Sequence, residues 1–294
     1  MPEEQFLDPD ELRKGGKIRF DDIPMNQYDK TLEEEKENYS KEELMKMYRD
    51  MVYIREFETM VKSMKDSSEY KGIEHNYLGP SHLYFGEESC AVGEAYVLDV
   101  EDFIFGSHRS HGEILAKGFA AIEKLSEDEL LNIMENFFGG KLFEVVKANN
   151  KNADTRELAM DFLLYGITAE IFFKDNGFNR GLGGSMHAFF TPFGIYPNNA
   201  IVGGSAPIGA GCALYKKVNQ KDGIVVANIG DGSLGCGPVW ESINFSAMGQ
   251  LKELWEKGYK GGLPIIFNFM NNLYGMGGQT AGETMAFDYL ARFG

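Results

Sequence analysis

The sequence predicts an α/β fold with a mostly parallel sheet flanked by helices, and two short apolar runs are the main reason. The runs cover residues 224–229 and 265–269, are rich in β-branched or aromatic residues, and are bounded by glycine or proline. This pattern is typical of buried parallel strands. Small and polar residues follow each run, at 230–233 and at 271–275. Since ligands bind at the carboxyl ends of strands in open α/β sheets, both ends are expected to serve one site.

The residues at these two strand ends suit a particular ligand. Asp231 and Asn272 supply hard oxygen atoms, which suit Mg²⁺ or Ca²⁺ better than zinc or copper. Gly230 and Gly232 let the backbone approach a ligand closely, and the free N–H groups of a helix predicted over 238–248 favour an anion. The combination indicates a metal-bridged diphosphate. The alternative is an ordinary strand–turn–helix corner, because Gly-Asp-Gly also occurs by chance.

Further elements follow from local signals along the chain. Ser40 and Glu43 form a capping-box pattern that opens an amphipathic helix. A second helix is predicted around 87–98, and residues 102–118 read as a short strand followed by a loop and a helix. The apolar stripe of the first helix, expected in the core or at a subunit interface, comprises Leu44, Met47, Met51, Ile54, Val61 and Met64.

Composition excludes several classes of function. The chain has 294 residues, of which 43% are hydrophobic, enough for a large core in one or two domains. A formal net charge of −16 argues against a general surface for nucleic acid or anionic membranes. No apolar run approaches the length of a membrane span, and the charged N-terminus lacks the core of a signal peptide. Three widely spaced cysteines without a CxxC pair suggest reduced thiols and a cytoplasmic protein.

Four sequence motifs resemble one known family. Gly-Asp-Gly followed by a helix, a strand and Asn-Asn looks like the thiamine diphosphate motif. HRSHGEILAKG at 108–118, RGLGGSMH at 180–187 and AIVGGSAPIGAG at 200–211 resemble the alpha subunit of the decarboxylating component of 2-oxo acid dehydrogenase complexes. That group acts on pyruvate, branched-chain 2-oxo acids or acetoin. The resemblance runs in the family's order from about residue 41 to 278, and four ordered motifs are more specific than any one.

The resemblance implies thiamine diphosphate and Mg²⁺ as cofactors, within a thiamine diphosphate-binding fold. It implies that Arg109 contacts the diphosphate, that the main chain around Val202 holds the aminopyrimidine ring, and that the Tyr274 carbonyl joins Asp231 and Asn272 as a metal ligand. The implied cofactor-binding residues are His108, Arg109, Val202, Gly230, Asp231, Gly232, Ser233, Asn272 and Tyr274.

Histidines complete the implied site. His82 corresponds to a histidine of the substrate pocket, and His82 and His111 are the candidate catalytic residues, His111 having a structural or near-site role as its alternative. His108 occupies a neighbouring cofactor position where some relatives have tyrosine. His187 is expected near the diphosphate or in the ordering of its loop. The glycines of the two motif loops fit close approach to a ligand or tight packing.

The expected organisation has two parts. Residues 1–39 are dense in charge and form an extended acidic arm, which either wraps a neighbouring subunit or remains a solvated tail. Residues 40–294 form the diphosphate-binding α/β domain, which is expected to be incomplete at its C-terminus because the family continues beyond it. Residues 142–176, an expected helical pair, and residues 251–262 are longer than the family pattern and are interpreted as insertions.

The family also implies partners. A glutamate that activates the aminopyrimidine lies on a separate pyrimidine-binding domain in the family, so this chain is expected to be inactive without a beta-type subunit, within an alpha2beta2 assembly served by a lipoyl-bearing acyltransferase. Two alternatives remain: the N-terminal half of a split transketolase, and a non-catalytic assembly protein that retains the fold. The motifs do not identify which 2-oxo acid is the substrate. Discrimination between substrates that differ by one methylene group amounts to only about 1–3 kcal/mol.

Overall fold

A four-stranded parallel sheet lies at the centre of the protein. The computed structural model describes residues 7–25, 27–253, 255, 261–286 and 289–290. The strand order is β4-β3-β5-β6, and every neighbouring pair is parallel. The predicted α/β fold is therefore confirmed, and the strands predicted at 224–229 and 265–269 differ from β5 and β6 by one residue. The strands are β3 (Phe103–Phe105), β4 (Ile195–Tyr196), β5 (Val225–Gly230) and β6 (Ile265–Met270).

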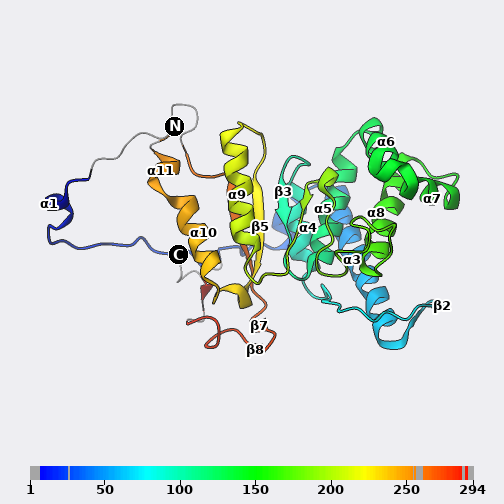
Figure 1. Ribbon diagram of the computed structural model, residues 1–294, viewed down its shortest axis with the longest axis horizontal. Helices are drawn as coiled ribbons and strands as arrows, with labels where there is room; N and C mark the ends of the chain where they lie inside the picture. Colours follow the sequence, from blue (N-terminus) through cyan, green and yellow to red (C-terminus); the bar gives the residue numbers. More distant parts are fainter. Residues whose placement is uncertain (1–6, 26, 254, 256–260, 287–288, 291–294) are drawn as a thin grey trace.

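Helices cover both faces of this sheet (Figure 1). One layer holds α3 (Lys41–Ser67), α4 (Glu88–Val97), α5 (Ser110–Lys124), α6 (Glu127–Asn136), α7 (Lys141–Asn149) and α8 (Thr155–Ile171). The other layer holds α9 (Ser205–Val218), α10 (Gly237–Ala247) and α11 (Gly249–Lys252). The helices expected after Ser40, around 87–98, after 102–105 and over 238–248 all form. Shorter elements are α1 (Pro9–Leu12), α2 (Leu32–Glu35), β1 (Glu69–Tyr70), β2 (Ile73–Glu74), β7 (Tyr274–Gly275) and β8 (Gly278–Gln279).

Local side chains start several of these helices. The predicted capping box at the start of α3 is present, with the Ser40 hydroxyl accepting from the Glu43 amide at 3.2 Å and the Glu43 carboxylate accepting from the Ser40 amide at 2.8 Å. Ser126 with Glu129 starts α6 in the same way, and Asp154 starts α8. Each box satisfies amides that have no partner inside the helix.

The two faces of β5 pack into different hydrophobic clusters because its side chains alternate. Val226 faces the large cluster beneath α3, α4, α5, α6 and α8, whereas Val225 and Ile229 belong to two smaller clusters beneath α9, α10 and α11. Six residue pairs connect β5 to β6, from Val225 opposite Ile265 to Gly230 opposite Met270. The strand order is thus unbroken by the expected insertion at 251–262, of which residues 254 and 256–260 lie outside the described residues.

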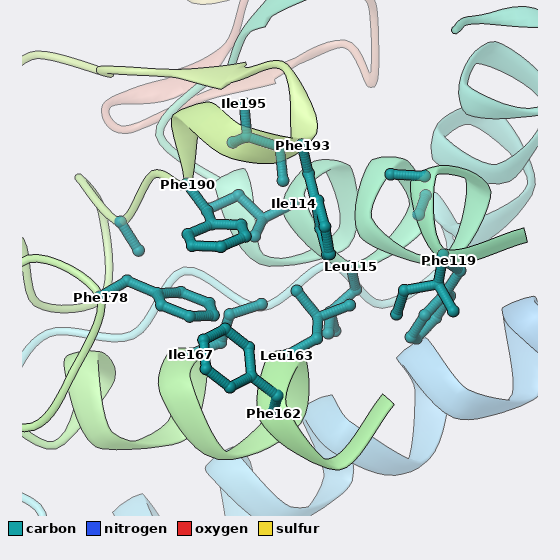
Figure 2. Packing of buried hydrophobic residues seen from close by; sticks show 14 of the residues in the cluster. Ile114, Leu115, Phe119, Phe162, Leu163, Ile167, Phe178, Phe190, Phe193 and Ile195 are labelled. Atoms are coloured by element: carbon teal, nitrogen blue, oxygen red, sulfur yellow. The ribbon is translucent and has the colours of Figure 1, made fainter. Parts of the chain in front are cut away.

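Aromatic side chains fill much of the large cluster. Figure 2 shows Phe162 on α8 and Phe178 and Phe190 from the following segment packed beside Leu115 of α5. The rings of Phe178 and Phe190 are stacked with centroids 4.4 Å apart, and the ring of Phe162 lies 5.7 Å from that of Phe178. The expected helical pair at 142–176 corresponds to α7 and α8, and α8 is an integral part of this core.

The N-terminal segment contributes little to these clusters. The described residues between 7 and 38 form α1 and α2 with irregular chain around them, and their side chains are mostly exposed; residues 1–6 and 26 of the expected arm lie outside the described residues. Among the helices of the described residues, none has both the length and the apolar character needed to cross a bilayer.

Candidate functional site

The carboxyl ends of three strands meet around one cavity. Asp231 follows β5 directly, and Asn272 comes two residues after the end of β6. The chain leaving β3 brings His108 and Arg109 to the same edge, just before α5. These segments surround a cavity of about 630 Å³. Its lining includes ten of the predicted site residues, namely His82, His108, Arg109, Val202, Gly230, Asp231, Gly232, Ser233, Asn272 and Tyr274.

Asp231 is an almost completely enclosed oxygen donor of the cavity. Only 3% of the residue is exposed. Its Oδ2 accepts a 2.7 Å hydrogen bond from the Thr280 hydroxyl, and its Oδ1 accepts one of 3.1 Å from the Gly232 amide. A carboxylate oxygen can accept more than one bond, so this carboxylate is held in position while retaining capacity for a cation.

Asn272 is oriented by its neighbours. Its Nδ2 donates to Glu87 Oε1 at 3.0 Å, and its Oδ1 accepts from the Tyr274 amide at 3.0 Å. The amide oxygen is therefore directed to the same turn that carries the Tyr274 carbonyl. Leu273 between them has φ +66°, a left-handed conformation that makes this turn tight.

Arg109 has one occupied and one unoccupied donor group. Its Nη1 donates to the Leu83 carbonyl at 2.8 Å. Its Nε is buried without a hydrogen-bond partner among the described residues, and it lies 4.0 Å from Glu87 Oε1. A buried donor without a partner is unfavourable, and the planar guanidinium suits an anion such as a phosphate.

Two histidines of the cavity lining lie edge to face. The ring centroids of His82 and His108 are 5.2 Å apart. Burial, the Arg109 guanidinium and His82 lower the pKa of His108 to about 4, against an opposing effect of Asp231. Burial, Arg109 and His111 likewise lower the pKa of His82. Near pH 7 both rings are therefore neutral, and each can donate one hydrogen bond and accept another.

The charges around the cavity are unbalanced. Glu87, Asp231 and Glu283 line it, whereas Arg109 is the single lysine or arginine among its described lining residues. The carboxylates would repel an anionic ligand, and a bound cation would offset this repulsion. The described residues contain no group of three or more histidine, cysteine or acidic side chains placed to hold a metal, so the available ligand set is one carboxylate, one amide oxygen and main-chain carbonyls.

The remaining predicted histidines occupy different positions. His187 lines the cavity together with Met186. His111 does not line it: the side chain is fully buried, its Nδ1 lies 3.0 Å from Glu58 Oε1 and its Nε2 lies 2.9 Å from Ser185 Oγ. The contacts of His111 favour the structural role over the catalytic one.

Sequence reasoning did not identify several residues of the cavity. Asn198 donates from Nδ2 to the carbonyls of Ser107 and Met186 and so ties two loops together. The residues that were missed lie in loops that carry no recognisable motif. Their contacts join parts of the chain that are up to 185 positions apart in sequence. The residues missed include Glu87, Asn198, Asn199, Thr280, Glu283 and Thr284.

Comparisons with known proteins place the chain among related sequences. The dehydrogenase E1 component family matches residues 156–293. The chain is 27% identical over 254 residues to the pyruvate dehydrogenase E1 component subunit alpha of Rhizobium meliloti (strain 1021), covering 86% of this chain and 55% of the relative. It is 30% identical over 238 residues to the corresponding subunit of Zymomonas mobilis, covering 81% and 50%. For the mitochondrial subunit of Dictyostelium discoideum the identity is 27% over 253 residues, covering 86% and 50%.

The chain spans about half the length of these curated relatives. The family match begins inside α8 and continues past β6, so it includes the second helix of the pair expected as an insertion. It also includes Asp231, Asn272 and the strands that carry them.

Proposed function

We propose that this chain, which is similar to the alpha subunits of pyruvate dehydrogenase E1 components, binds thiamine diphosphate through Mg²⁺ and serves the oxidative decarboxylation of a 2-oxo acid. One observation supports this most directly. Asp231 and Asn272, from the ends of adjacent parallel strands, line the same cavity as Arg109. A cation and an anion would thus each find their preferred ligands at one site.

Each residue has a defined task in this proposal. Asp231, the Asn272 side-chain oxygen and the Tyr274 carbonyl hold the Mg²⁺, which offsets the acidic lining of the cavity. Arg109 donates to the diphosphate through its Nε, which has no other hydrogen-bond partner in the described structure. Gly232 faces Gly275, and a Cβ added to Gly232 would lie in ordinary van der Waals contact, 3.7 Å from the Gly275 Cα. Side chains at these positions would narrow the space that a diphosphate needs.

The histidines serve the substrate end of the cavity. When bound, thiamine diphosphate supplies the electron sink that allows a 2-oxo acid to lose carbon dioxide. His82 and His108, neutral near pH 7, hydrogen-bond to the substrate and orient its carboxylate without adding charge. His187 lies in the same lining and helps to exclude water.

A beta-type subunit completes the site in this proposal. It supplies the glutamate that activates the aminopyrimidine, within an alpha2beta2 assembly that delivers its product to a lipoyl-bearing acyltransferase. The exposed apolar side chains at the cavity support such a partner: Ile201 is 70% exposed, Val202 62% and Met276 fully exposed. Apolar surface of this kind at the edge of a site is typical of an interface.

Titration calorimetry tests the cofactor proposal. Wild-type chain should bind thiamine diphosphate only when Mg²⁺ is present. Asp231→Ala should weaken the binding by about 2–5 kcal/mol, because it removes the charged metal ligand. Asp222→Ala is the matched control, since this exposed aspartate precedes the opposite end of β5. Absence of binding by the wild type with Mg²⁺ would favour the non-catalytic assembly protein.

An activity assay tests the partner and the reaction. The purified chain should not decarboxylate 2-oxo acids alone, and addition of a beta-type subunit should allow reduction of an artificial acceptor by a 2-oxo acid. Decarboxylation by the single chain would contradict the need for a partner. Ketol transfer between sugar phosphates, in place of 2-oxo acid oxidation, would instead support the split transketolase.

A further inference from the structure

A ring of four backbone amides surrounds the carboxylate of Glu170. The residue is fully buried in the last turn of α8. Its Oε2 accepts from the amides of Asn179 at 2.7 Å and Gly181 at 2.9 Å. Its Oε1 accepts from the amides of Gly183 at 2.6 Å and Gly184 at 3.2 Å. One side chain thus accepts from four backbone amides of the glycine-rich loop and the residue before it.

This arrangement must serve the loop, because it is unfavourable for the helix. A buried carboxylate loses its hydration, and a negative charge at the C-terminal end of a helix is opposed by the helix dipole. Four charge-assisted hydrogen bonds offset both costs. Gly181 and Gly184 have φ of +72° and +59°, and these left-handed conformations let the amides converge on one point.

The loop continues directly into the wall of the cavity. Ser185 binds the His111 ring, and the two following residues, Met186 and His187, line the cavity. The Met186 carbonyl accepts from Asn198 Nδ2 at 2.7 Å. A displacement of the loop would therefore move Met186 and His187 directly.

Glycine-rich loops with convergent amides commonly bind phosphate. Here Glu170 already occupies the place that an anionic ligand would take. We propose that Glu170 is a positioning residue: its carboxylate shapes the loop 179–184 from within and thereby holds Met186 and His187 in the cavity wall. The expected effect on ligand binding rests on the function proposed above. The effect on the positions of Met186 and His187 does not.

Glu170→Gln is the direct test because glutamine has the same size. The single side-chain oxygen of glutamine can accept hydrogen bonds from one pair of loop amides. Its NH₂ group is a donor and cannot accept from the other pair, so those two amides lose their partner. Ile167→Val is the matched control: this fully buried residue lies one turn earlier on α8, and its substitution lowers stability without changing a hydrogen bond of the loop. Melting temperatures of both variants establish that each is folded.

Two readouts decide the proposal. In NMR spectra without any ligand, the Met186 methyl and His187 ring signals should shift in Glu170→Gln and stay unchanged in Ile167→Val. Unchanged signals in Glu170→Gln, or equal shifts in both variants, would overturn the positioning role. This readout does not depend on the proposed function.

Calorimetry then measures the effect on the site. With Mg²⁺, Glu170→Gln should bind thiamine diphosphate roughly tenfold more weakly than wild type, while Ile167→Val should bind as wild type does. Equal affinity in all three proteins would show that Glu170 does not act on the ligand site. If the wild type itself fails to bind, the proposed function is wrong, and the NMR comparison still decides the role of Glu170.

Discussion

The Thr280 hydroxyl donates a 2.7 Å hydrogen bond to Asp231 Oδ2 across 49 positions of sequence. Both residues are almost completely buried, with 1% and 3% of their surface exposed. Thr280 comes directly after β8 and Asp231 directly after β5. The contact therefore joins the turn beyond β6 to the end of the neighbouring strand and fixes the direction in which the carboxylate points.

Removing this hydroxyl should weaken cation binding. In Thr280→Val the Asp231 Oδ2 loses its donor, which costs about 1–3 kcal/mol in a buried site and frees the carboxylate to rotate. Mg²⁺-dependent binding of thiamine diphosphate, measured by calorimetry, should fall roughly 10- to 100-fold, as for other residues that orient a metal ligand. Thr280→Ser retains the hydroxyl and should bind nearly as wild type does. Equal loss in both variants would assign the effect to packing instead.

Acid should destabilise the protein through His108. Its folded-state pKa of about 4 lies below the ordinary value of 6.5, so the unfolded chain takes up a proton that the folded protein excludes between these values. Stability is therefore complete above about pH 6.5 and decreases as the pH falls towards 4. Urea unfolding at pH 7 and pH 5 measures this loss.

His108→Asn should show a smaller loss of stability between pH 7 and pH 5 than the wild type. His75→Asn is the control, because the His75 ring packs at a tilt against Phe172 and does not line the cavity. An NMR titration should also place the His108 midpoint near 4. A midpoint at 6.5 would contradict the electrostatic description of the cavity.

His111 should act on stability. In His111→Leu the buried Glu58 side chain loses its hydrogen-bond partner on the ring, and leaving a buried polar group without its partner typically costs about 1–3 kcal/mol. The free energy of unfolding should fall accordingly. The double variant Glu58→Gln with His111→Leu should recover part of this loss, because no uncompensated carboxylate remains. If stability were unchanged and decarboxylation by the assembled enzyme were abolished, the catalytic role would be correct.

The aromatic core should determine stability without determining affinity. Phe162 is fully buried and contacts the rings of Phe137, Phe178 and Phe190. Phe162→Ala should lower the free energy of unfolding by about 3–5 kcal/mol, as measured with urea. Phe138→Ala, at a ring that is 41% exposed, should cost much less. Folded Phe162→Ala should bind cofactor with unchanged affinity, and a parallel loss of affinity would show that this core shapes the cavity.

The sheet could be predicted from sequence because its central strands carry strong local signals. The apolar runs predicted at 224–229 and 265–269 are bounded by glycine or proline, and they became β5 and β6, each six residues long. In contrast, β4 has only two residues, too few for an apolar periodicity, and it pairs with β3 from far along the chain. The pairing of a short edge strand depends on the rest of the fold, so its own sequence shows no alternation or apolar run by which it could be predicted.

The candidate site could be predicted only in part. Residues that belong to motifs, such as Asp231, Asn272 and Arg109, do line the cavity. Thr280 supports Asp231 across 49 positions, and Glu170 holds a loop 9 to 14 positions further along the chain. No local pattern reveals which donor a buried carboxylate will meet. His111 belongs to the same motif as Arg109, yet it is the second residue of α5 and its side chain is buried against Glu58. Membership of a motif therefore did not distinguish a cavity residue from a buried neighbour.

The division of the interior into one large and two small clusters has a consequence for how this protein can change. Asp231 and the helix after it rest on the smaller cluster of Ile229, Leu234 and Val239, whereas most of the apolar material lies across the sheet. Mutations in the large cluster would change the global stability and therefore the amount of folded protein in a cell. Mutations in the small cluster would change the position of Asp231 and therefore the affinity for a ligand. The abundance of the folded protein and its affinity for a ligand can thus change independently of each other through mutations in different clusters.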